Sequence, residues 1–201
     1  MNFFSDNELH TLKNSEFLHI KNKVLDKIRN KLSETGQKLV KEIKSDFPDI
    51  HKRFSRESPK VSKGENYHGL PYMVLDYPRF FEKGYTFSFR ITFLWGHYLN
   101  CSLHVEGNMI DIHSMEKRWA TISKQQVYVC IHSSPWEHYL TDPYFKLSSS
   151  MDVNEFKNHF KKNHFIKIAS RLEFDQMKNL PDLAIGEFKS LLQFLEPNLP
   201  E

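Results

Sequence analysis

The chain has 201 residues, of which 39% are hydrophobic, 26% are charged and 14% are aromatic. This composition is typical of a soluble globular protein, and the length suits one domain whose core needs neither disulfides nor a structural metal. Collagen-like, low-complexity disordered and disulfide-scaffold chains are excluded.

The formal net charge of +3 is unevenly distributed. Residues 1–65 contain 14 Lys and Arg against 10 Asp and Glu, whereas residues 66–201 contain 14 against 15. A basic segment can attract nucleic acid or an acidic protein. A solvated helix face, with lysines for solubility, is the simpler interpretation.

Two cysteines, Cys101 and Cys130, lie in apolar stretches. Such a pair is typical of buried thiols in a reducing compartment. The first residues lack the basic and apolar regions of a secretory signal. No stretch approaches the ~18 apolar residues of a membrane helix. We therefore expect a cytoplasmic protein that does not bind a membrane.

Residues 16–45 have apolar side chains every three or four positions, which predicts an amphipathic helix. Gly36 interrupts the stripe, either as a tolerated interior glycine or as a break between two helices. We expect the stripe to pack on the protein's own sheet, although it is also suited to a dimer helix. Pro48 ends the pattern, and residues 48–66 show no apolar period.

Three segments that follow have strand patterns. Residues 72–77 lie between Pro71 and Pro78, which predicts a short edge or terminal strand. Residues 86–95 and 98–106 alternate between apolar and polar side chains, which predicts a hairpin.

The register of this hairpin follows from its two faces. A three-residue connection with Gly96 at its left-handed position keeps apolar side chains together on one face and polar ones on the other. A two-residue turn would oppose apolar to polar side chains on both faces. The predicted apolar pairs are Phe93 with Leu99, Ile91 with Cys101, and Phe89 with Leu103.

The C-terminal part alternates between both kinds of element. We expect strands at 126–132 and 165–174, an aromatic-rich loop at 133–150, a helix capped by Asp152, and a helix from Pro181 to Leu195. Residues 108–125 are ambiguous.

The order of elements predicts an α+β fold, in which helices pack on one face of a curved antiparallel sheet. Its parts are an N-terminal helical segment (1–47), a basic linker loop (48–66) and a sheet domain (67–201), which together form one compact domain. The alternative is a separate helical hairpin beside a smaller sheet domain.

Standard catalytic and cofactor signatures are missing. The glycine pair Gly64 and Gly69 has P-loop spacing, but the lysine that would clamp a phosphate is absent. The sequence contains no Gly-x-Gly and no Gly-x-Ser-x-Gly. Cys101 and His104 are three residues apart on a strand, so they face opposite sides and do not share a metal. We predict no metal and no cofactor.

The polar face of the hairpin is the main candidate site. Arg90, Ser102, His104 and Glu106 would lie on it, and Asp76 and Arg79 of the preceding strand would join them. A histidine beside a carboxylate and a guanidinium can bind an anion or transfer protons. One face of an antiparallel sheet is commonly wet, so we expect this face to be exposed unless the loop 133–150 covers it.

The run Lys52, Arg53, Phe54 and Arg56 is a weaker candidate for nucleic acid, because basic residues around an aromatic ring can hold phosphates and stack on a base. An exposed, charged linker is the simpler interpretation.

Three functions therefore stay open. The first is a non-catalytic domain, monomeric or homodimeric, that binds a small molecule or a protein. The second is an enzyme that uses His104 with Glu106 or Asp76 as an acid–base pair. The third is a nucleic-acid-associated protein that uses the basic N-terminal third.

Overall fold

A computed structural model of the chain describes residues 3–108 and 110–195, so the last six residues of the predicted sheet domain lie outside the described residues. Its helices are α1 (Asp6–Lys13), α2 (Ser15–Asp46), α3 (Pro48–Phe54), α4 (Ile112–Ile122), α5 (Val153–Asn163) and α6 (Leu180–Leu195), with short 3-10 helices η1 (Ser148–Ser150) and η2 (Phe174–Asn179). Its strands are β1 (Lys60–Tyr67), β2 (Leu70–Glu82), β3 (Tyr85–Leu94), β4 (Tyr98–Glu106), β5 (Tyr128–Cys130), β6 (Phe145–Leu147) and β7 (Phe165–Leu172).

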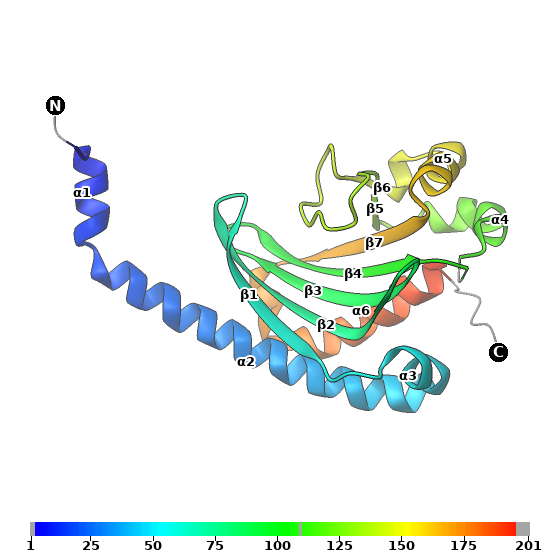
Figure 1. Cartoon of the computed structure of the whole chain (residues 1–201), viewed down its shortest axis with the longest axis horizontal. Coiled ribbons are helices and arrows are strands. Elements are labelled where there is room, and N and C mark those ends of the chain that lie inside the picture. The colour runs from blue at the N-terminus through cyan, green and yellow to red at the C-terminus, as the bar shows by residue number, and fades with distance from the viewer. Residues whose placement is uncertain (1–2, 109, 196–201) are drawn as a thin grey trace.

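The seven strands form one curved antiparallel sheet in the order β1-β2-β3-β4-β7-β5-β6. Helices α2 and α6 lie side by side against one face of it (Figure 1). Phe89 of β3 and Phe47, just after α2, both make edge contacts with the ring of Phe188 in α6, at 5.2 and 5.5 Å. The predicted α+β fold is confirmed.

The β3–β4 hairpin has the predicted register. Phe93 opposes Leu99, and Arg90 opposes Ser102. Gly96 has a φ of 75° in the connection, a left-handed conformation that glycine adopts without strain. The apolar side chains of both strands are buried under the helices, so hydrophobic alternation was enough to define this pair.

Helix α2 is continuous through Gly36, so of the two alternatives the tolerated interior glycine is confirmed. A Cβ atom at Gly36 would lie only 2.8 Å from the Cβ of Pro59. The glycine therefore lets the segment before β1 cross the helix at close range. Asn14 caps the first turn of α2 by accepting from the backbone N–H of Phe17 at 3.1 Å.

Two expectations for the middle of the chain are wrong. Residues 48–66 form α3 and most of β1 rather than a linker loop. β1 is an edge strand with polar side chains on both faces, and therefore lacks an apolar period. β2 is an interior strand, paired with both β1 and β3, although Pro71 and Pro78 lie within it. The β2–β3 register shifts between Asp76 and Arg79, around Pro78, which has no N–H for the ladder.

The C-terminal elements follow the predicted order. Asp152 caps α5 by accepting from the backbone N–H groups of Asn154 and Glu155 at 2.7 and 2.9 Å. The ambiguous residues 108–125 contain α4. Trp119 of this helix stacks on Phe156 of α5 at 4.7 Å, which ties the two helices together.

The beginning of the chain projects from the rest of the molecule (Figure 1). We refer to residues 3–20 as the N-terminal arm; it comprises α1 and the first turns of α2. Phe17 and Ile20 are 50% and 53% exposed, so the expectation that the whole stripe packs on the sheet is wrong for its beginning. None of the helices in the described part of the chain is long and apolar enough to cross a membrane.

Candidate functional site

The polar face of the hairpin gathers part of the predicted site. Arg90 of β3 forms a paired interaction with Asp76 of β2, from Nε to Oδ1 at 2.6 Å and from Nη2 to Oδ2 at 3.0 Å. Ser102 and His104 lie on the adjacent β4, on the same face as Arg90. These four residues come together because residues two apart on a strand share a face.

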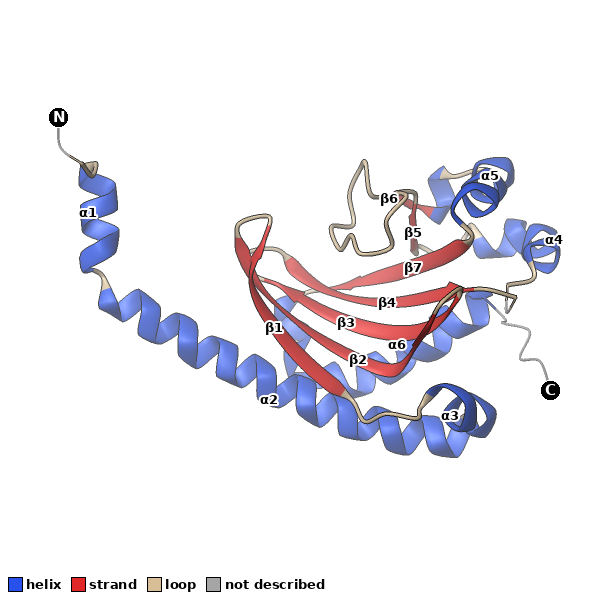
Figure 2. Cartoon of the chain, viewed as in Figure 1, coloured by secondary structure: helices blue, strands red, loops and turns tan. Residues whose placement is uncertain are grey.

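This face is covered rather than wet, which overturns the expectation of a solvent-facing sheet. The loop between β5 and β6 lies over it, on the side opposite α2 and α6 (Figure 2). Asn100 donates to the carbonyl of His138 at 2.9 Å, and the ring of Trp136 lies 5.2 Å from the guanidinium carbon of Arg90. The aromatic-rich segment identified in the sequence is therefore the cover.

Lys167 of β7 binds this loop to the sheet through hydrogen bonds. Its Nζ donates to the carbonyls of Pro135 and Glu137 at 2.8 and 2.6 Å. Burial lowers the pKa of Lys167 to about 7, with the nearby Arg90 acting in the same direction. This lysine is absent from the site predicted from the sequence. Its position between Ile166 and Ile168 in a predicted strand is the signal that places it on the polar face.

His104 is buried among cations. Burial, followed by the charges of Lys167 and Arg90, lowers its pKa to about 3. Its Nε2 has no hydrogen-bond partner among the described residues. At neutral pH the imidazole is uncharged, and no carboxylate in the described part of the chain is hydrogen-bonded to it. This geometry lacks the His–carboxylate pair that the enzyme hypothesis needs.

The other two predicted residues lie outside this cluster. Glu106 accepts from the hydroxyl of Thr86 at 3.3 Å, near the end of the hairpin. Arg79 pairs with Glu57 and donates to the carbonyl of Ser58 at 3.1 Å, because the β2 irregularity shifts it relative to β3.

The space enclosed by the polar cluster is small. Ser88, Ser102, His104 and Lys167 line a cavity of about 10 Å³ beneath Trp136. That volume suits a single water molecule, whereas ligand pockets measure about 300–1,000 Å³. The cluster therefore fastens the loop to the sheet, and it is not an open binding pocket.

The basic candidate at residues 52–56 also differs from the expectation. Phe54 is fully buried and stacks on Phe87 at 4.5 Å, so the prediction that it stacks on a base is wrong. The guanidinium carbon of Arg53 lies 5.2 Å from this ring, and that of Arg56 lies 5.5 Å from the ring of Phe80. Lys52 lies on α3 in the same run. The aromatic ring of this run therefore lies in the core and is not presented to a nucleic acid.

A larger space lies on the other side of the molecule. An open groove of about 560 Å³ runs between the middle of α2, the β3–β4 connection and η2. Its walls are mostly apolar and are formed by Val24, Ile28, Phe93, Trp95, Gly96, Phe174 and Met177. Its rim carries three lysines, Lys27, Lys31 and Lys178. This groove could not be predicted from the sequence, because three segments that are distant along the chain form it.

The groove adjoins the exposed arm. The described residues include nine exposed large apolar side chains, and six of them lie in the arm: Phe3, Phe4, Leu12, Phe17, Leu18 and Ile20. Phe17 and Ile20 continue the stripe of α2 that includes Val24 and Ile28 in the groove wall, since steps of three and four residues stay on one side of a helix.

Comparison with protein-family models, curated proteins and solved structures finds no match. The described residues contain no group of three or more His, Cys, Asp or Glu side chains placed to hold a metal. The polar face of the sheet and the groove beside α2 are therefore the two candidate sites. Of these, only the groove has the size of a binding site.

Proposed function

We propose that the protein is a binding module that takes an acidic amphipathic helix of a protein partner on the groove beside α2. The observation that carries this proposal is the groove of about 560 Å³, one wall of which is formed by the apolar stripe of α2. Grooves lined by apolar and aromatic side chains are the usual receptors for the apolar face of a helix.

The lysines on the rim indicate the charge of the partner. Lys27 and Lys178 have no carboxylate partner within the described part of the chain, and Lys31 pairs with the neighbouring Glu34 at 2.6 Å. A helix with an apolar stripe and flanking carboxylates would satisfy both the walls and the rim.

Binding of the dye anilinonaphthalene sulfonate tests the groove, since this probe combines apolar rings with one negative charge. We expect it to bind the full-length chain and to quench Trp95 in the groove wall. Phe174→Ala should weaken this binding about tenfold, because large apolar side chains dominate such contacts.

Phe81→Ala is the matched control. Phe81 is another partly exposed ring, 44% exposed against 41% for Phe174, but it lies beside Trp136 over the polar face. This variant should bind the dye as the wild type does. The proposal is wrong if the dye does not bind, or if both variants weaken binding equally.

A further inference from the structure

The N-terminal arm has the chemistry that the groove requires. Three carboxylates, Asp6, Glu8 and Glu16, lie in it against a single ammonium, Lys13. Its apolar side chains are exposed, and no residue of α1 is buried. The arm is thus an acidic apolar segment, whereas the groove is an apolar surface with lysines on its rim.

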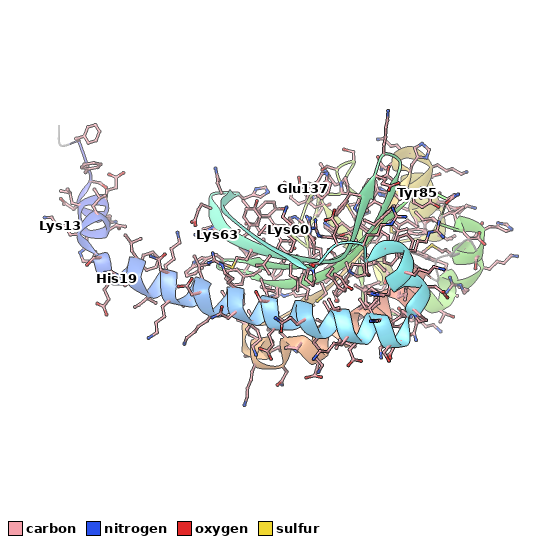
Figure 3. The ribbon with its side chains drawn as sticks, turned by 60° about the horizontal axis from the view of Figure 1, so that its bottom comes forward. Lys13, His19, Lys60, Lys63, Tyr85 and Glu137 are labelled. Atoms are coloured by element: carbon pink, nitrogen blue, oxygen red, sulfur yellow. The ribbon has the colours of Figure 1, made fainter. Side chains whose placement is uncertain are left out.

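The arm forms a helix without packing on the molecule that carries it. Ser5 and Glu8 close a complete capping box at the start of α1. A helix of eight residues is nonetheless marginal in water unless an apolar face packs on something. Figure 3 shows Lys13 and His19 on the arm, well away from the sheet. The apolar face of the arm therefore does not pack on the rest of its own chain.

The exposed area is large for a surface without a partner. At roughly 100 Å² for each half-exposed large side chain, the six apolar residues of the arm present about 600 Å², near the upper end of the patches found on monomers. Together with the groove walls, this area approaches the ~800 Å² that each partner buries in a standard interface.

We infer that the occupant of the groove is the N-terminal arm of a second copy of this chain, and that the two copies exchange arms about a two-fold axis. This inference rests on the proposed function and names its partner. An antiparallel pairing of the two α2 helices centred beside Ile20 places Phe17 opposite Val24 of the second copy.

In the exchanged dimer each of the two grooves is filled by the arm of the other copy, and each arm is covered. Each arm brings Asp6 and Glu8 towards the lysines of the other copy, and each groove receives the leucines and phenylalanines of the other arm. Because both contacts are the same by symmetry, the assembly closes at two chains and does not propagate.

Sedimentation of the full-length chain over a range of concentrations tests this inference. We expect a species of two chains, and Ile20→Glu should weaken the association at least about a hundredfold, since it places a charge in an apolar contact. Asn22→Glu is the control, because Asn22 is exposed and lies on the opposite side of the helix from the stripe. This variant should stay a dimer.

Disulfide formation adds a positional readout. Both native cysteines are buried, so an introduced cysteine reports alone. Ile20→Cys, near the two-fold axis, should crosslink two chains under mild oxidation, and Asn22→Cys, on the opposite side of the helix, should not. The dye should compete with the arm and dissociate the dimer.

A chain that is monomeric at every concentration overturns the arm exchange. If such a monomer still binds the dye in a Phe174-dependent way, the proposed groove survives and only its occupant is wrong. If dye binding is also absent, both proposals fail. A monomer that cosediments with phosphatidylserine vesicles would assign the arm to a lipid surface and overturn the exchange.

Discussion

His104 should make the folded chain lose stability as the pH falls. The usual pKa of 6.5 applies in the unfolded chain, whereas burial lowers the pKa in the folded chain to about 3. Between these values the unfolded chain binds a proton that the folded chain does not. The stability contribution is therefore complete above about pH 6.5 and decreases as the pH falls towards 3.

The magnitude follows from linkage. Each pH unit within this window removes up to about 1.4 kcal/mol, so His104 alone should cost roughly 2–3 kcal/mol between about pH 7.5 and pH 4.5. His138 is also buried with a lowered pKa and acts in the same direction. The comparison must therefore be made between the wild type and a variant that lacks only His104.

Urea unfolding at several pH values provides the assay. His104→Gln removes the titrating ring, so the wild type should lose roughly 2–3 kcal/mol more than this variant over the same range. His113→Gln is the control, because it removes an imidazole whose side chain is 75% exposed. Equal pH dependence in the wild type and His104→Gln would refute the burial of this ring among cations.

Two further predictions concern stability. Gly36→Ala should destabilise the chain by roughly 1–2 kcal/mol, although alanine favours helices, because its Cβ would lie 2.8 Å from that of Pro59. Gly186→Ala in α6 meets nothing within 4 Å and should instead stabilise it by up to ~1 kcal/mol. A Gly36→Ala variant that is as stabilised as Gly186→Ala in thermal unfolding would show that the close approach is wrong. Asp76→Ala should cost about 3–5 kcal/mol in urea unfolding, since it leaves the Arg90 charge buried without its carboxylate, and a loss below ~1 kcal/mol would mean that this pair is solvated.

Local patterns predicted the elements whose two faces differ. The hairpin register could be worked out because Phe89, Ile91 and Phe93 alternate with polar residues, so any other pairing would mix the faces. Helix α2 followed from its apolar period. In contrast, β1 has polar residues such as Lys60 and Lys63 along an edge, and its pairing with β2 depends on tertiary structure that no local period records.

The site was harder to predict than the fold, because it depends on what covers each surface. The sequence placed Arg90, Ser102 and His104 on one face, but it did not reveal that Lys167 and the loop over it would bury them. The period of α2 likewise continues unchanged from Phe17 to Ile28, although only the later part meets the sheet. Periodicity identifies an apolar face without identifying its partner.

Hydrogen exchange of the full-length chain, followed by mass spectrometry at low and high chain concentration, tests the central claim most directly. The account predicts that amides in residues 6–20 exchange rapidly in the dilute chain and become protected in the concentrated one. The part of α2 that packs on the sheet should be protected in both. Arm amides that exchange at the same rate at both concentrations would contradict the claim that a second copy covers the arm.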